Sequence, residues 1–224
     1  LFKESLKRRL KKEPISKIFN SKNFWKYNFY VNKSVLDPRP ETEHIIEKIL
    51  HYFPNKKKKL KILDICTGSG CIAISLAKEY LNAKIIGTDI SYKALKVAQI
   101  NSEKMQCNNI NFIKCDLLNK ISKYDIVVSN PPYLSKHDLE TISDAIKIYE
   151  PKIALFAKNN GYEFYTRLAA LLPNIISKKS MVFIEIGHSQ AKKSIKIFES
   201  NKLNCLEIIK DYQNLDRGII LNKT

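Results

Sequence analysis

Short apolar runs alternate with longer, helically periodic segments from residue 60 to the end of the chain. Runs of four to six mostly apolar residues predict strands, and they lie at 61–65, 84–88, 111–114, 125–129, 181–186, 206–209 and 218–221. Apolar spacings of three and four predict helices at 71–80, at 92–105, beyond Gly161 and at 190–199. This alternation is typical of an α/β fold with helices on both faces of a mostly parallel sheet. We expect a Rossmann-like sheet of seven strands with an antiparallel C-terminal edge.

The first 35 residues follow a different pattern. Residues 1–12 form a basic helical stretch that Glu13-Pro14 ends, and aromatic residues between 24 and 30 predict a short hairpin. Because the chain begins with Leu1 and not with Met, we expect a leading segment to be missing. The pattern predicts two parts. Residues 1–35 would be the remnant of an N-terminal helical domain plus a connecting hairpin, and residues 36–224 would form the α/β domain.

The composition suits a soluble protein of this class. Of the 224 residues, 44% are hydrophobic and 27% are charged, and no apolar run approaches the ~20 residues that cross a bilayer. The start of the chain has no signal-peptide pattern. We therefore expect a cytoplasmic monomer that does not bind membranes.

The formal net charge of +17 admits two interpretations. It fits a protein that works beside nucleic acid or on a ribosome-associated target. It also fits a compositional bias toward lysine, because the lysines are scattered apart from Lys56 to Lys59. Direct nucleic-acid binding is therefore permitted by the charge but not required by it.

Cysteines and histidines predict neither a disulfide framework nor a metal site. The five cysteines form no C-x-x-C pair, and the four histidines are dispersed along the chain. An odd number of cysteines, several of them in or beside predicted strands, is typical of reduced, buried residues that pack as small apolar groups.

The segment from Asp64 to Gly70 joins the first long strand to the helix over 71–80. Its glycines permit positive φ and the close approach of a ligand, and the helix N-terminus adds unpaired N–H groups. Asp89 closes the next strand 19 residues after Gly70, where a carboxylate can accept both hydroxyl protons of a ribose. The spacing is D-x-x-x-G-x-G and not G-x-G-x-x-G, because Cys66 takes the first small-residue position. A class I S-adenosylmethionine fold tolerates this form, and a tight turn without a ligand is the alternative.

Two further segments end strands at the same edge of the predicted sheet. Asp116-Leu117 would border an adenine ring, or would be an ordinary loop. Asn130-Pro131-Pro132-Tyr133 follows a strand and suits the positioning of a planar amide or amine, although such a run can also be only a turn. We expect S-adenosylmethionine as the cofactor, held by Asp64, Cys66, Thr67, Gly68, Ser69, Gly70, Asp89, Ile90, Asp116, Leu117 and Asn130.

Four stretches that cover nearly all of the chain carry a family resemblance. They are Glu13-Pro14-Ile15 with Asn23-Phe24-Trp25, the segment Asp37 to Glu43, the segment Ser129 to Tyr133, and Glu150-Pro151 with Ala154-Leu155 and Gly161. On these residues the chain resembles the release-factor glutamine N(5)-methyltransferases, the PrmC/HemK family. The match of Asp37 to Glu43 to the family's P-R-P-x-T-E signature is far more specific than the glycine turn.

The resemblance implies a class I S-adenosylmethionine-dependent methyltransferase whose catalytic domain is residues 36–224. Its implied activity is transfer of a methyl group to the amide nitrogen of the glutamine in the Gly-Gly-Gln loop of peptide chain release factors. The chain departs from the family at Cys66, which replaces a common glycine, and in lacking most of the leading helical bundle.

The resemblance also implies roles for individual residues. Asn130, Pro131 and Tyr133 are the expected catalytic residues: the Asn130 side-chain oxygen and the Pro131 carbonyl would each accept one amide hydrogen. Tyr133 would sandwich the glutamine side chain against Leu36, with Pro132 beside them. Arg39, Thr42 and Glu43 would shape the lip of the pocket.

Three alternatives stay open on the sequence alone. One is a nucleic-acid methyltransferase acting on an exocyclic adenine or guanine amine, which poses the same problem of a conjugated nitrogen. Another is a methyltransferase for a ribosomal-protein glutamine, since that related family often has Cys at the position of Cys66. The third is a basic ribosome- or RNA-binding module with a degenerate cofactor pocket.

Overall fold

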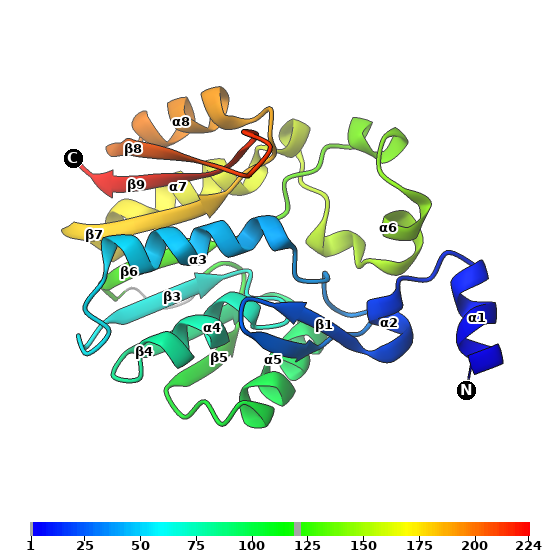
Figure 1. Cartoon of the computed structure of the whole chain (residues 1–224). Helices are drawn as coiled ribbons and strands as arrows, with labels where there is room; N and C mark the ends of the chain where they lie inside the picture. The colour runs from blue at the N-terminus through cyan, green and yellow to red at the C-terminus, as the bar shows by residue number, and fades with distance from the viewer. Residues whose placement is uncertain (1, 119–121) are drawn as a thin grey trace.

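The computed structural model describes residues 2–118 and 122–224, so Leu1 of the predicted first helix lies outside the described residues. Within these ranges seven strands form one sheet in the order β5-β4-β3-β6-β7-β9-β8 (Figure 1). Their bounds are β3 (Lys61–Ile65), β4 (Lys84–Asp89), β5 (Ile110–Lys114), β6 (Tyr124–Ser129), β7 (Ile176–Glu185), β8 (Leu203–Lys210) and β9 (Asp216–Lys223). The five neighbouring strands β5, β4, β3, β6 and β7 pair in parallel, whereas β9 is antiparallel to both β7 and β8. The predicted mixed sheet with its antiparallel edge is confirmed.

The strand order reverses between β3 and β6. From β3 the chain moves outward through β4 and β5, and then returns to place β6 on the other side of β3. A reversal of this kind opens a crevice at the carboxyl ends of the two central strands, where ligands bind in open α/β sheets. The segments after Ile65 and after Ser129 therefore meet at one place.

Helices cover both faces of the sheet (Figure 1). α3 (Pro40–Tyr52) and α4 (Cys71–Glu79) pack on one face, α7 (Glu163–Ile175) and α8 (Ala191–Glu199) pack on the other, and α5 (Tyr92–Lys104) packs beside β4 and β5. Because side chains alternate along a strand, Ile126 and Val128 join the α3–α4 core while Val127 joins the α7–α8 core. Strands buried on both faces read as continuous apolar runs, which is why the central strands were predictable.

The N-terminal hairpin shares the core of the sheet. α1 (Phe2–Leu10) buries no side chain, but α2 (Ile15–Phe19) leads into a hairpin of β1 (Ser21–Phe24) and β2 (Tyr27–Tyr30). Phe24 and Phe29 are almost completely buried and belong to the α3–α4 core cluster. The hairpin turn is anchored as well, since the Trp25 backbone N–H donates to Glu43 at 2.9 Å and its indole N–H donates to Glu79 at 3.1 Å.

Two regions differ from the sequence prediction. The connection between β6 and α7 contains α6 (Asp144–Tyr149) and three short 3₁₀ turns (His137–Glu140, Lys152–Ala154 and Asn159–Gly161) that no periodicity announced. β7 begins at Ile176, five residues before the predicted start at Met181, because Ser177 to Ser180 are polar yet continue the strand. A strand with a polar end does not read as an apolar run.

The cysteines, expected to be buried, are all half-buried.

Phe29→Ala tests whether the hairpin is part of the same cooperative unit. Phe29 is fully buried in the α3–α4 core, so truncation should lower the free energy of unfolding by about 3–5 kcal/mol. Urea unfolding followed by circular dichroism should show a single transition shifted to lower urea. Asn28→Ala, which alters only an exposed side chain of the same hairpin, should leave the midpoint nearly unchanged. An unshifted main transition for Phe29→Ala would mean that the hairpin folds as a separate module.

Candidate active site

A cavity of about 470 Å³ lies at the carboxyl ends of β3, β4 and β6, a size typical of small-molecule sites. Of the predicted cofactor residues, all except Asp64 and Gly70 contribute to its wall. Of the predicted substrate residues, Leu36, Arg39, Asn130 and Pro132 line it, whereas Pro131 and Tyr133 do not. The fold thus brings most of the predicted residues together around one space.

The turn after β3 owes its shape to three residues with positive φ. Cys66, Gly68 and Gly70 have φ angles of 62°, 56° and 79°. The left-handed region suits glycine, so Cys66 holds a strained conformation at the position where the resemblance implies glycine. A Cβ on Gly70 would lie 2.9 Å from Cδ1 of Ile74 and 3.1 Å from Cβ of Ala98. Gly70 therefore serves the packing of α4 against α5, and this explains its absence from the pocket wall.

Asp64 braces this turn from within the protein. It is fully buried, and its Oδ2 accepts hydrogen bonds from the Thr67 hydroxyl at 2.6 Å and from the Ala73 N–H at 3.2 Å. Burial raises the pKa of the carboxyl group to about 7. Asp64 therefore fixes the conformation of the turn and the start of α4 without facing the cavity.

Asp89 occupies the wall at the end of β4. Its two oxygens each accept one backbone hydrogen bond, Oδ2 from Gly68 at 3.0 Å and Oδ1 from Ser91 at 2.8 Å. Burial raises the pKa of this carboxyl group. Because a carboxylate oxygen has more than one acceptor position, both oxygens keep capacity for the hydroxyl groups of a ligand.

Asp116 has a partner that the sequence did not indicate. The guanidinium of Arg167, on α7, lies 2.7 Å from Oδ2 of Asp116, and both residues line the cavity. The neighbouring Leu117 is buried and has a φ angle of 61°. Strained backbone of this kind gathers at ligand sites, and here it is found at Cys66 and Leu117 on two sides of the same cavity.

Asn130 faces the cavity from the end of β6. Its side-chain Nδ2 donates to the Thr42 hydroxyl at 3.3 Å, so the amide is held from the side of α3. The preceding Ser129 hydroxyl donates to the Ile65 carbonyl at 2.8 Å, which ties the end of β6 to the start of the glycine turn. Thr42, predicted at the lip, does line the cavity.

Tyr133 lies behind the wall and not in it. Its hydroxyl donates to Glu185 at 3.4 Å, and its carbonyl accepts from Nε2 of Gln190 at 2.9 Å. Gly161 packs against the same carbonyl so closely that a Cβ there would lie 2.3 Å from the oxygen. Leu36 lines the cavity and Tyr133 does not. The stacking of Tyr133 against the glutamine side chain therefore stays a prediction.

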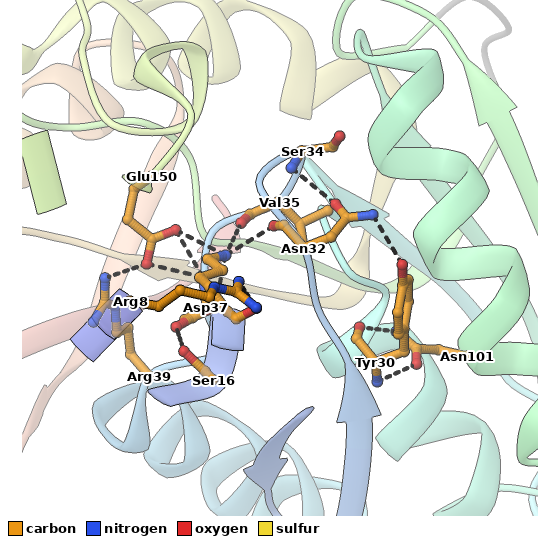
Figure 2. A network of polar contacts seen from close by, with 11 residues as sticks. Arg8, Ser16, Tyr30, Asn32, Ser34, Val35, Asp37, Arg39, Asn101 and Glu150 are labelled. Carbon is orange, nitrogen blue, oxygen red and sulfur yellow. Dashed lines mark hydrogen bonds and ion pairs between the residues drawn. The ribbon is translucent and has the colours of Figure 1, made fainter. Parts of the chain in front are cut away.

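A charge cluster is formed by the buried residues Lys17, Asp37 and Glu150 and the partly exposed Arg39. Figure 2 shows Asp37, Arg39 and Glu150, and of the cluster Asp37 and Arg39 belong to the cavity wall. The Lys17 ammonium lies 2.7 Å from Asp37 and 3.2 Å from Glu150, and Arg39 lies 3.2 Å from Glu150. Lys17 also donates to the carbonyls of Asn32 at 2.9 Å and Val35 at 2.7 Å. One ammonium from α2 thereby organises the loop that carries Asp37 to the cavity wall.

One expectation about the site needs revision, and one residue was missed. Glu43 was predicted at the lip, but its carboxylate accepts from the Trp25 backbone and it is not part of the wall, so its role is to anchor the hairpin. Lys17 was not singled out by the sequence at all. A lysine three residues after Pro14 is expected to be a solvated charge. Only the folded structure shows that Lys17 is 5% exposed.

Within residues 2–118 and 122–224, no group of three or more His, Cys, Asp or Glu side chains is arranged to hold a metal ion. In the same described ranges, no helix has the length and apolarity needed to span a membrane.

Comparison with known proteins adds four findings. The family model described as "Methyltransferase small domain" matches residues 46–149. A release factor glutamine methyltransferase of Fusobacterium nucleatum subsp. nucleatum is 37% identical over 95% of this chain, which spans 61% of the relative's length. A release factor glutamine methyltransferase of Staphylococcus aureus is 38% identical over 96% of this chain and 78% of the relative. Among solved structures, the protein-(glutamine-N5) methyltransferase (release factor-specific) from Alicyclobacillus acidocaldarius subsp. acidocaldarius aligns with a TM-score of 0.51 at 25% identity, covering 83% of this chain and 93% of that one.

Asp64→Asn should stabilise the protein, and the gain should grow with pH. The pKa of Asp64 is raised by burial to about 7, above an ordinary value of about 4. The stability that its protonated form contributes is complete below pH ~4 and is lost as the pH rises through about 7. Asparagine keeps an acceptor for Thr67 and Ala73 without this loss. Urea unfolding at pH 5, 6.5 and 8 should show an increasing advantage of the variant, whereas a constant difference would contradict the assignment.

Lys17→Met should be strongly destabilising. Among the described residues it leaves the buried carboxyl groups of Asp37 and Glu150 with one paired cation, Arg39 on Glu150, and an uncompensated buried charge costs about 3–5 kcal/mol. Thermal and urea unfolding measure the loss. Lys33→Met removes an exposed lysine of the neighbouring loop and should change stability by no more than about 0.5 kcal/mol. Equal stability of the two variants would show that the cluster does not hold the cavity wall.

Proposed function

The chain belongs to the release factor glutamine methyltransferases, and on this premise we propose that it transfers a methyl group from S-adenosylmethionine to the glutamine of a release factor's Gly-Gly-Gln motif. The acceptor atom would be the side-chain amide nitrogen of that glutamine. One observation carries the proposal: Asn130 lies in the wall of the same cavity as the glycine turn and Asp89, with its Nδ2 bonded to Thr42. A group that can bind the substrate amide, Asn130, thereby lies beside the residues that would bind the nucleoside part of the cofactor.

The residues around the cavity fit S-adenosylmethionine. The two Asp89 oxygens, each with one backbone donor, would receive the ribose hydroxyls. A Cβ on Gly68 would meet nothing closer than 4.0 Å, so the turn leaves room for a ligand against its backbone. Asp116 and Leu117 would border the adenine. When bound, the cofactor supplies a methyl group activated by an adjacent sulfonium.

Asn130 and Pro131 would then orient the acceptor amide. A glutamine amide nitrogen is a poor nucleophile because its lone pair is delocalised into the carbonyl group. We expect the Asn130 side-chain oxygen to accept one amide hydrogen. The carbonyl of Pro131, which lies beside the cavity wall and not in it, would accept the other. These bonds would aim the nitrogen and favour its change toward tetrahedral geometry. No general base is needed at the start, because the nitrogen becomes acidic only as the C–N bond forms, and it would then release its extra proton to solvent.

Arg39 offers a second contribution, at the mouth of the cavity. Its guanidinium is held at 3.2 Å by the buried Glu150, while about a third of its side chain stays exposed. A fixed donor group at the entrance suits the backbone carbonyls of an incoming peptide loop.

The cytoplasmic location, the monomeric state and the predicted two-part division of the chain stay predictions.

The formal charge of +17 favours a nucleic-acid methyltransferase as the second candidate, because an exocyclic base amine needs the same kind of acceptors. Labelled S-adenosylmethionine, offered separately with release factor, ribosomal protein and nucleic acid, distinguishes the candidates. Label should enter the release factor and should be absent from a release factor whose Gly-Gly-Gln glutamine is replaced by alanine. Label in nucleic acid alone would overturn the proposal.

Asn130→Ala should reduce methyl transfer by at least about a hundredfold, as loss of a donor or acceptor at a developing charge does. Cofactor affinity, measured by calorimetry with S-adenosylmethionine, should stay within a few fold of the native value, because Asn130 acts mainly on the acceptor amide. Survival of the transfer activity in this variant would refute the mechanism.

A further inference from the structure

Behind the cavity wall lies a buried carboxylate that the proposed reaction does not yet use. Glu185 ends β7 and is 3% exposed, and it is not part of the wall. Its Oε2 accepts a hydrogen bond from the Thr42 hydroxyl at 2.5 Å, and its Oε1 accepts from the Tyr133 hydroxyl at 3.4 Å. Thr42 in turn accepts from Nδ2 of Asn130. A single chain of hydrogen bonds therefore runs from Glu185 to Asn130.

The chain has a direction because its members differ in what they can donate. An ionised carboxylate only accepts, and a threonine hydroxyl has one proton. Once Thr42 gives that proton to Glu185, it can offer Asn130 only lone pairs. The side-chain nitrogen of Asn130 must then face Thr42, and the side-chain oxygen must face away from it. Glu185 thus determines which end of the Asn130 amide the cavity presents.

We propose that Glu185, acting through Thr42, is a positioning residue that holds the Asn130 amide with its oxygen toward the acceptor nitrogen. The inference rests on the proposed function, in which Asn130 accepts an amide hydrogen of the substrate. Without this chain, Asn130 can turn its own NH2 group toward the NH2 group of the substrate. Two donors would then face each other at the reacting atom.

The effect should appear mainly in kcat. As the C–N bond forms, the acceptor nitrogen gains positive charge and its hydrogens become stronger donors. A correctly oriented Asn130 oxygen therefore stabilises the transition state more than the bound substrate. A variant that loses only this orientation should lower kcat more than it raises KM.

Protonation of Glu185 gives a second signature. Burial raises its pKa to about 7. The ionisable groups that interact with it come from five parts of the fold, and they are Glu41, Cys71, Tyr133, Tyr165 and Arg217. A protonated Glu185 can donate to Thr42, which frees the Thr42 proton for the Asn130 oxygen and allows the amide to turn. Activity should therefore rise as the pH increases through about 7.

Four variants of the full chain test the proposal with release factor as substrate. Thr42→Val and Glu185→Gln should each lower kcat about tenfold or more, the effect of a lost transition-state bond worth about 1.4 kcal/mol. Thr42→Ser restores the hydroxyl and should stay within about threefold of the native kcat. The double variant Thr42→Val/Glu185→Gln should lose little more than either single variant, because both act through one chain. Glu185→Gln should also lose the rise of kcat around pH 7.

Matched controls separate positioning from stability. Glu79→Gln alters another carboxylate that is 8% exposed and has several donors, and Ser180→Ala removes a hydroxyl that is 2% exposed in the middle of β7. Both lie outside the cavity wall, so they should lower the melting temperature without changing kcat or its pH profile. Calorimetry should give S-adenosylmethionine affinities within about threefold for all variants.

A spectroscopic readout keeps this inference distinct from the proposed function. The side-chain amide signals of Asn130, assigned by their loss in Asn130→Ala, should show slowed hydrogen exchange that Thr42→Val abolishes. That measurement needs no substrate, so it stands even if the native protein does not methylate release factor. Unchanged amide signals in Thr42→Val would overturn the inference. So would native kcat in both Thr42→Val and Glu185→Gln when the native protein does methylate release factor.

Discussion

The parallel pairing of β3 with β6 is the contact on which the site depends. It sets Ile65 opposite Ser129, and the Ser129 hydroxyl secures the Ile65 carbonyl. The residues that follow each strand, the glycine turn on one side and Asn130 on the other, consequently emerge beside each other. Asn130 is neither a strong nucleophile nor a base, so its value comes from its position beside the glycine turn. A slip of β6 by one residue would turn Asn130 toward the opposite face of the sheet.

Sequence patterns were informative where the determining contacts are local. The buried strands, the D-x-x-x-G-x-G turn and the run from Asn130 to Tyr133 each carry their meaning within a few residues, and each was found. The ion pairs of Lys17 with Glu150 and of Arg167 with Asp116 join distant segments. No periodicity encodes such a pair, because either side chain alone resembles an ordinary surface charge.

The carboxyl groups around the cavity share one electrostatic condition. Burial is the first cause of a raised pKa at Asp64, Asp89, Glu150 and Glu185. Each resists ionisation until a donor or a positive charge compensates it. Of these four groups only Asp89 belongs to the cavity wall, and the other three lie outside it.

The contacts of Lys17 determine where the protein can be shortened. The division expected from the sequence falls between residues 35 and 36, yet the ammonium that neutralises Asp37 and Glu150 comes from α2 on the other side of that line. A chain that starts at residue 36 would keep the acidic pair of Asp37 and Glu150 with Arg39 as the paired cation. It would lose the Lys17 ammonium that binds both carboxylates. Engineers who want a minimal catalytic unit should therefore keep α2 and begin the gene upstream of Pro14.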